Sequence, residues 1–196
     1  MACISLTRGR GLDCNRSSGG VKYIYFGVYD QFEVGGVLTL PTVVNSEVTV
    51  IEMGVGTGLY RYTVPRGSTT INETITGSTE NGTLFYTPTV SMILNRLTKE
   101  DQNEIKLLGQ TQVVCFAQLN ATLANGHDVI VGMGVTNAMS LNAGSADSGA
   151  GFGDRNGYTL TFDGLEANPF PMVADYTTIP FDNAGFNFGA GNPATS

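Results

Sequence analysis

The chain of 196 residues contains no tryptophan, one histidine and three cysteines. Catalytic triads and hydrolytic metal centres need histidine within a defined set of partners, which a single histidine does not supply. We therefore expect His127 to be an exposed polar residue beside a turn, and the scattered cysteines disfavour a structural zinc site. The absence of tryptophan also removes the largest aromatic surface on which a sugar ring stacks. The sequence thus predicts no catalytic residue, no cofactor and no bound metal.

Motifs for phosphate, calcium or acid–base chemistry are also missing. A phosphate-binding loop needs a lysine and a following helix, and the Gly-rich stretch at 142–157 has neither. Asp147 and Asp154 lie in that stretch without the ligand spacing of a calcium loop. The adjacent acids Glu100 and Asp101 point in different directions on a helix, and capping of the helix start explains them. No pair of carboxylates is singled out for catalysis.

Long apolar runs are absent too. No run approaches the length of a membrane helix, and residues 1–6 lack the apolar region of a secretory signal, so we expect no membrane anchor. The odd number of cysteines, with no metal-type spacing among Cys3, Cys14 and Cys115, indicates reduced thiols and assembly in a cytoplasm. Cys115 lies in an apolar run, which is typical of a small core residue.

Charged residues make up only 14% of the chain, well below the usual quarter. A neutral polar surface is cheaper to desolvate than a charged one, which favours an interface, although a Thr-rich β-domain alone would show the same composition. Residues 1–22 carry four basic side chains and one acidic one, whereas residues 23–196 carry six basic and 16 acidic ones. A basic arm on an acidic body either grips a neighbouring copy or is simply solvated. The net charge of −7 argues against wrapping of nucleic acid.

Most of the sequence has the pattern of β-strands, rich in β-branched and aromatic residues. The pair Asn81-Gly82 predicts a hairpin turn, and Pro88 predicts an edge position or a bulge because proline cannot donate to a ladder. The two apolar runs on either side of Asn125-Gly126 predict a central hairpin that is buried on both faces. The expected strands are 21–29, 48–53, 59–64, 69–76, 83–94, 113–119, 128–135 and 158–166.

One helix stands out among these strands. Thr98 is a helix-capping residue, with Asp101 three positions later, where a capping-box acid belongs. Gly109 is placed to end the helix in the left-handed conformation. Ile105 and Leu108 form a narrow apolar stripe that we expect to lie on a sheet.

These patterns predict a mainly β fold, a β-sandwich or barrel with one flanking helix at about 98–109. We divide the chain into an extended N-terminal arm (1–20), a single β-rich domain (21–181) with a Gly-rich loop (142–157), and a C-terminal tail (182–196) of weak local structure. A loop as long as 142–157 inside a compact domain is usually functional or disordered, and we expect it to order against a neighbour.

The order of these elements resembles that of bacteriophage tail tube proteins, whose fold is shared with the tube proteins of contractile injection machines. The resemblance is carried by the hairpin from Glu73-Thr74-Ile75 to Leu84-Phe85-Tyr86-Thr87-Pro88, the helix at 99–108, and the strand from Gly157-Tyr158-Thr159 to Leu165-Glu166. It covers roughly residues 21–175. No short motif is diagnostic of this family, so the resemblance is one of pattern.

This resemblance implies a non-enzymatic virion subunit of the tail, assembled in the host cytoplasm. Six copies would form a ring with a continuous inner β-barrel, and rings would stack into a tube through which DNA passes without specific binding. Sheath, terminator and baseplate proteins are further partners that it implies. The inter-subunit contacts are expected in the arm and in the Gly-rich loop, at Arg8, Arg10, Arg16, Phe152, Asp154 and Arg155.

Two other classes of function remain open at this point. A capsid decoration or head-surface protein is also a β-domain that binds a lattice of other subunits, and what the purified protein builds alone would separate it from a tube subunit. An enzyme or carbohydrate-binding β-sandwich would need a concave acidic or aromatic site, and the sequence names no residues for one.

Overall fold

The computed structural model describes residues 9–11 and 17–190 and is mainly β, with one α-helix. The predicted mainly β fold with one flanking helix is confirmed, and each predicted strand is present within three residues at either end. The elements, in chain order, are β1 (Val21–Val28), a 3-10 turn (Tyr29–Gln31), β2 (Glu33–Val34), β3 (Val37–Leu38), β4 (Thr42–Val44), β5 (Glu47–Glu52), β6 (Tyr60–Thr63), β7 (Thr70–Ser78), β8 (Thr83–Asn95), α1 (Lys99–Leu108), β9 (Val113–Thr122), β10 (Asp128–Met133), β11 (Ser140–Asp147), β12 (Gly157–Asp163), β13 (Met172–Val173) and β14 (Phe186–Asn187).

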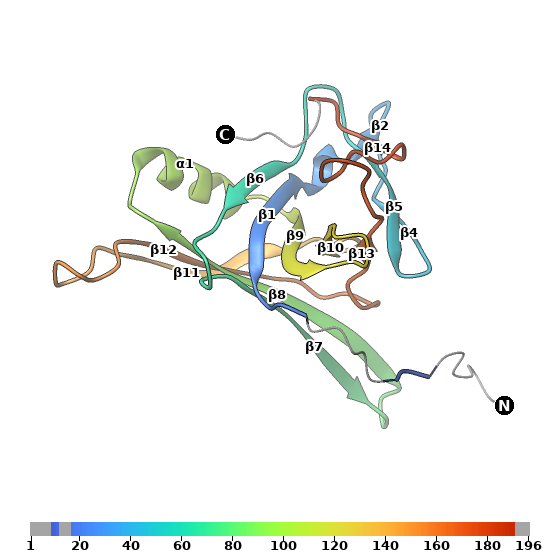
Figure 1. Ribbon diagram of the computed structural model, residues 1–196, viewed down its shortest axis with the longest axis horizontal. Helices are drawn as coiled ribbons and strands as arrows, with labels where there is room; N and C mark the ends of the chain where they lie inside the picture. The colour runs from blue at the N-terminus through green and yellow to red at the C-terminus, as the bar shows by residue number, and fades with distance from the viewer. Residues whose placement is uncertain (1–8, 12–16, 191–196) are drawn as a thin grey trace.

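The strands form two main sheets that pack against each other (Figure 1). The larger sheet has the order β14-β5-β13-β10-β9-β1-β6, with β4 beside β5, and the smaller has the order β11-β12-β8-β7. The predicted central hairpin is confirmed as β9 and β10, whose described residues are mostly buried. Successive side chains of β1, β9 and β10 alternate between the two faces of the larger sheet, so each face builds a separate core.

The first core lies between the two sheets. Ile24 and Phe26 of β1 meet Phe162 of β12, and the rings of Phe26 and Phe162 lie 4.8 Å apart. Cys115 also points into this core and is fully buried, as predicted, and burial raises the pKa of its thiol. Cys3 and Cys14 lie outside the described residues.

The second core lies on the opposite face of the larger sheet and is rich in aromatic rings. The ring of Phe181 packs 4.9 Å from that of Tyr25 and 5.6 Å from that of Phe116. Phe188 is buried beside them, and β14 pairs in parallel with β5. Between residues 182 and 190 the only strand is Phe186–Asn187, so this part of the predicted tail is held by contacts with distant parts of the chain rather than by local structure of its own. Phe181 and Phe188 anchor this segment in the second core. The backbone also lies close to the β5 end of the sheet, because a methyl group at Gly189 would be only 1.8 Å from the carbonyl oxygen of Gly54.

Two further predictions about strands and loops are corrected. The Gly-rich loop predicted at 142–157 is shorter, because Ser140–Asp147 forms β11 and pairs along β12, which leaves 148–156 as the connection. The small residues of β11 allow it to lie close to β12, where Gly144 packs tightly against Leu160.

Pro88 is neither at an edge nor in a bulge, because β8 lies between β7 and β12. Its carbonyl accepts a hydrogen bond from the N–H of Gly164, the residue after β12. The N–H that proline lacks would therefore face the end of β12, where the ladder between β8 and β12 no longer requires a donor.

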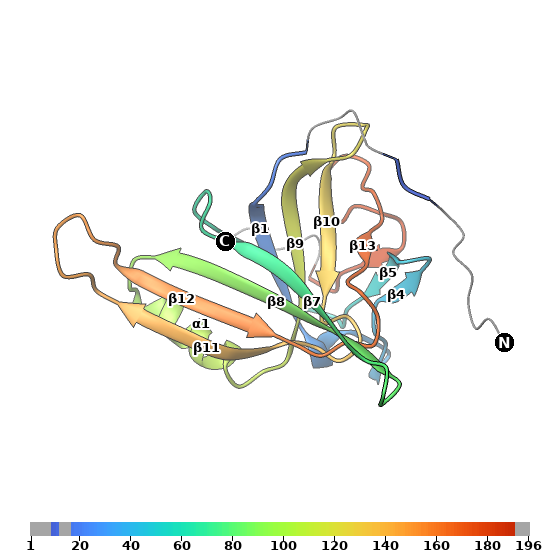
Figure 2. The ribbon, with the colours of Figure 1, turned by 90° about the horizontal axis from the view of Figure 1, so that it is seen from below.

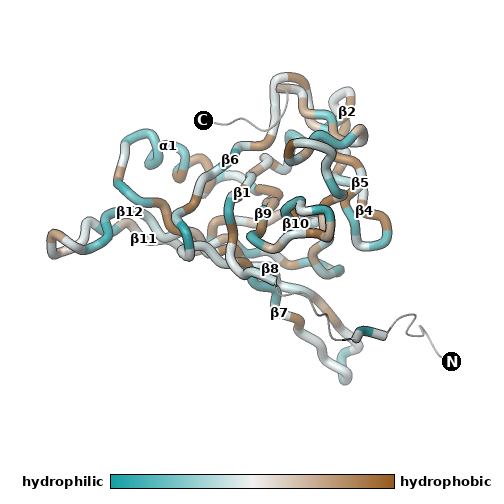
Figure 3. The backbone as a smooth tube through the Cα atoms, in the orientation of Figure 1, coloured by the Kyte–Doolittle hydropathy of each residue, from teal (hydrophilic) through white to brown (hydrophobic). Residues whose placement is uncertain are grey.

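Helix α1 follows β8 and is largely hydrophilic (Figure 3). The Asp101 N–H donates to the Thr98 hydroxyl at 3.0 Å, which confirms the predicted cap. Gly109 keeps right-handed angles (φ −73°, ψ −14°), so the predicted left-handed end is wrong; its N–H donates to the Ile105 carbonyl instead. Ile105 and Leu108 are only half-buried against the first core, so the helix contributes less buried area than a fully embedded one.

Replacing Thr98 with alanine should lower the free energy of unfolding by about 1 kcal/mol, because the Asp101 N–H loses its hydroxyl acceptor. Urea denaturation of the two proteins would measure the difference. Thr98→Ser keeps an acceptor in the same place and should stay close to the parent protein. Equal losses in both variants would show that the methyl group, rather than the cap, matters.

Candidate assembly surfaces

The outer face of the four-stranded sheet is mostly polar, with Phe85 and Ile93 as apolar exceptions, and carries little charge. Strand alternation places it opposite the buried side chains of Val90, Met92, Leu160 and Phe162. Cross-strand rows continue across it, as from Thr70 through Ser91 to Thr161. The side chains that β7, β8 and β12 place on this face are Thr70, Asn72, Thr74, Thr76, Ser78, Thr83, Phe85, Thr87, Thr89, Ser91, Ile93, Thr159, Thr161 and Asp163. None of these strand residues is basic, and the cation that reaches this face is Arg155 of the β11–β12 connection, whose guanidinium donates to Thr159 at one end of the sheet.

Both edges of this sheet are open in the part of the chain that the structure describes. β7, nine residues long, forms one edge, and β11, eight residues long, forms the other. Each presents unpaired N–H and C=O groups, which are templates for pairing with another strand. Charged side chains, which commonly protect an edge strand, are scarce here: β7 contains one charged residue, Glu73, and β11 contains one, Asp147.

The β7–β8 hairpin extends beyond the body of the protein (Figures 1 and 2). Its outer half, including Thr83 to Phe85, pairs with β7 and has no partner in β12. Ile75 and Leu84 lie on the same side of the hairpin as the core residue Val90, yet they are 64% and 58% exposed. The apolar face of this sheet therefore continues past the protein's own core.

The second projecting hairpin joins β11 to β12 at the opposite end of the sheet (Figure 2). Phe152 in its connection is fully exposed. Asp154 accepts hydrogen bonds from the N–H groups of Gly151 and Ala150, which lower the pKa of its carboxyl. Arg155 donates to the Thr159 hydroxyl at 2.8 Å. Asp154 and Arg155 thus shape their own hairpin, and Phe152 is the side chain left to meet a partner.

The predicted contact residues of the arm are only partly covered by the structure. Arg10 is exposed, and Arg8 and Arg16 lie outside the described residues. The structure brings Phe152, Asp154 and Arg155 into one loop and does not join Arg10 to them by any described hydrogen bond or ion pair.

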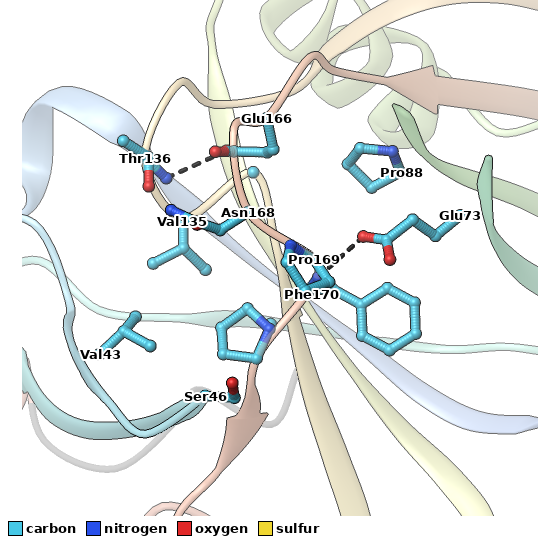
Figure 4. A pocket seen from close by; sticks show the side chains of 13 residues that line it. Val43, Ser46, Glu73, Pro88, Val135, Thr136, Glu166, Asn168, Pro169 and Phe170 are labelled. Atoms are coloured by element: carbon cyan, nitrogen blue, oxygen red, sulfur yellow. Dashed lines mark hydrogen bonds between the residues drawn. The ribbon is translucent and has the colours of Figure 1, made fainter. Parts of the chain in front are cut away.

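A cavity of about 260 Å³ lies where the two sheets meet the segment 166–171, and two carboxylates line it (Figure 4). Glu166 is buried and accepts hydrogen bonds from the N–H groups of Thr136 and Asn137. Glu73 accepts one from the Phe170 N–H at 2.7 Å. Sequence reasoning missed this pair, because its members lie 93 positions apart along the chain, and only the folded register brings them to one cavity. Each carboxylate fastens a loop to the body.

Burial raises the pKa of Glu73, and the negative charge of Glu166 adds to the effect. Above its unfolded-state pKa the carboxyl is ionised in the unfolded chain but keeps more of its proton in the folded one, so this group's contribution to stability falls as pH rises. Glu73→Gln keeps an acceptor for Phe170 without the charge. Its free energy of unfolding, relative to the parent protein, should therefore rise between pH 4.5 and 7.5. A difference that is independent of pH would contradict this assignment.

His127 is half-buried, which corrects the expectation of an exposed residue. Its Nδ1 lies 2.8 Å from a carboxylate oxygen of Asp175, and its ring stacks on Tyr176 at 4.4 Å. The hydrogen bond from His127 is the main cause that lowers the pKa of Asp175. The Asp128 N–H donates to the Tyr176 hydroxyl. Together these contacts attach the segment after β13 to the β9–β10 turn. Among the described residues, no hydroxyl or thiol side chain that could serve as a nucleophile hydrogen-bonds to His127.

Residues 9–11 and 17–190 contain no group of three or more His, Cys, Asp or Glu side chains that would hold a metal ion. The one helix within these ranges is too short and polar to cross a membrane. No protein-family model, no curated protein and no solved structure matches this chain.

Proposed function

We propose that this chain is a structural subunit that assembles with copies of itself into a tube of the bacteriophage tail type, through which DNA passes. The observation that carries the proposal is the β7–β8 hairpin, whose apolar face continues past its own core and leaves Ile75 and Leu84 exposed. An apolar extension of a core-forming face is typical of a surface that a partner covers. The resemblance of the element order to tail tube proteins agrees with this role.

The open edges give the subunits a way to join. Neighbouring strands in the order β11-β12-β8-β7 are antiparallel, so β7 of one copy and β11 of the next run in opposite directions around a ring. Pairing between them satisfies the edge N–H and C=O groups and joins the small sheets into one barrel. Each hairpin then lays Ile75 and Leu84 against the neighbouring copy.

The outer face of the small sheet suits the wall of a channel for DNA. Affinity for DNA comes mostly from lysine and arginine neutralising phosphates, and the strand residues of the Thr-rich face include neither; Arg155 reaches the face at its end, where it hydrogen-bonds to Thr159. Its charged side chain, Asp163, repels the phosphate backbone. A face of this kind lets a polyanion slide without being held, which is what a delivery channel requires.

Negative-stain electron microscopy of the purified protein across a concentration series tests the proposal. Rings or hollow tubes of uniform width are the expected result. Small particles without a central hole at every concentration would overturn it. Those particles would favour the capsid-decoration alternative, in which the same exposed hairpin binds a lattice of other subunits.

A further inference from the structure

A groove of about 850 Å³ runs beside β6, the strand at the other open edge of the larger sheet. β6 pairs with β1 on one side, and no described strand pairs with it on the other. The groove is bounded by β6, by the end of β8 and by the exposed face of α1. It therefore combines an unpaired strand edge with a wall built by a helix, which is the geometry that accepts an added strand.

The groove is apolar at its base and acidic along the helix. Tyr62 and Leu94 are half-buried against the first core, and Asp101 and Glu104 line the α1 side. Burial raises the pKa of Tyr62 to about 12, and the nearby carboxylates of Glu104 and Asp101 add to the effect. Neither carboxylate forms an ion pair with any described residue. Arg61 also lines the groove, with its guanidinium 4.8 Å from the ring centroid of Tyr23. The groove thus offers two carboxylates without an ion-pair partner beside an apolar strip.

The N-terminal sequence has the complementary pattern. In residues 4–10 the even positions are Ile4, Leu6, Arg8 and Arg10, and the odd positions are Ser, Thr and Gly. In an extended strand the even positions share one face, so two apolar side chains are followed by two cations on the same side. The two apolar side chains suit the apolar base of the groove, and the two arginines suit the carboxylates of the helix beside it.

The start of β1 indicates that the strand comes from another copy. The carbonyl oxygens of Gly19 and Gly20 accept hydrogen bonds from Asn120, which belongs to β9. The chain before β1 therefore leaves on the β9 side, whereas β6 flanks β1 on the opposite side.

We propose that residues 4–10 of a second copy add as a strand to the open edge of β6, with Ile4 and Leu6 toward Tyr62 and Leu94 and the two arginines toward Asp101 and Glu104. This rests on the proposed self-assembly and names the contact made by the basic arm. The strand satisfies the free backbone groups of β6, and the arginines neutralise the helix carboxylates in a partly enclosed site.

Cysteine cross-linking in the full-length chain tests this contact. In a Cys14→Ser background, Asn95→Cys places a thiol in the groove, Cys3 remains in the arm, and Cys115 is fully buried. A bis-maleimide should link copies through Cys3 and residue 95 into a ladder on a denaturing gel. Val55→Cys, fully exposed outside the groove, is the matched control and should give little ladder. Equal ladders in both, or a link confined to single chains, would overturn the proposal.

Charge reversal separates this strand contact from mere proximity. Glu104→Arg should reduce the ladder roughly tenfold, as expected for the loss of about 1.4 kcal/mol. Glu100→Arg makes the same change on the same helix at a residue outside the groove, beside Lys99, and should have little effect. Arg8→Glu with Arg10→Glu should abolish the ladder, and combining them with Glu104→Arg should partly restore it. Equal effects of the two helix variants would overturn the proposal.

Microscopy of the same samples distinguishes the two proposals. Tubes without a groove-specific ladder would leave the proposed function standing and overturn the arm contact. Monomers without a ladder would overturn the proposed self-assembly and the arm contact with it.

Discussion

Replacing Ile75 and Leu84 with aspartate should give a folded monomer that no longer forms rings or tubes. Both side chains are more than half exposed in the monomer, so the substitutions cost little folding stability. In the proposed assembly each would be buried against a neighbouring copy, and burying an unpaired carboxylate there costs several kcal/mol. The concentration needed for assembly should rise by roughly a hundredfold or more, which corresponds to about 2.7 kcal/mol.

Analytical ultracentrifugation and negative-stain microscopy would measure this effect, with thermal unfolding as a check on the fold. Val55→Asp is the control, because Val55 is 98% exposed in the connection between β5 and β6, away from the hairpin. It should assemble like the parent protein. Assembly of the double aspartate variant at the parental concentration would show that the hairpin tip does not contact a neighbour.

The parts of the fold that sequence predicted are those fixed by local chemistry. The Thr98 cap and the Asn81-Gly82 turn depend on residues a few positions apart, and both are present. The central hairpin around Asn125-Gly126 follows from two adjacent apolar runs. Each of these signals is complete within a short window of sequence, so no knowledge of the distant chain is needed.

The parts that sequence missed depend on partners far away along the chain. β11 consists of small polar residues that resemble a loop, and it becomes a strand because β12 offers an edge for it. Residues 186–187 pair with β5, which lies more than 130 positions earlier. The cavity pair Glu73 and Glu166 meets only through the register of β7 and the path after β12. A local sequence pattern cannot predict these contacts, because it does not include the distant partner.

The candidate assembly surfaces likewise include parts that the sequence predicted and parts that it missed. The sequence predicted that the arm and the Gly-rich loop make contacts, because unusual composition is visible locally. It placed Ile75 on an alternating strand but did not show that the strand continues past its core, since the extent of the core depends on how far β12 reaches along β8. Of the predicted loop contacts, Asp154 and Arg155 also have hydrogen-bonding partners within their own hairpin.

Replacing Phe181 with alanine should produce the largest loss of stability among the variants considered, about 3–5 kcal/mol. Phe181 is 1% exposed, and its ring lies against those of Tyr25, Phe116 and Phe188. Its φ of 66° is unfavourable for a residue with a large side chain, so the aromatic contacts must also offset that backbone cost. The substitution removes the ring while the backbone strain remains.

Chemical denaturation should be measured in the Ile75→Asp, Leu84→Asp background, where the protein is expected to be monomeric and unfolding is not coupled to assembly. Phe152→Ala is the matched control, because that phenylalanine is fully exposed and its loss should change stability by less than about 0.5 kcal/mol. If the second core anchors the chain end as the structure indicates, Phe181→Ala should also expose the segment after β13 to protease before the rest unfolds. Similar unfolding midpoints for the two alanine variants would mean that this aromatic cluster does not hold the C-terminal segment in place.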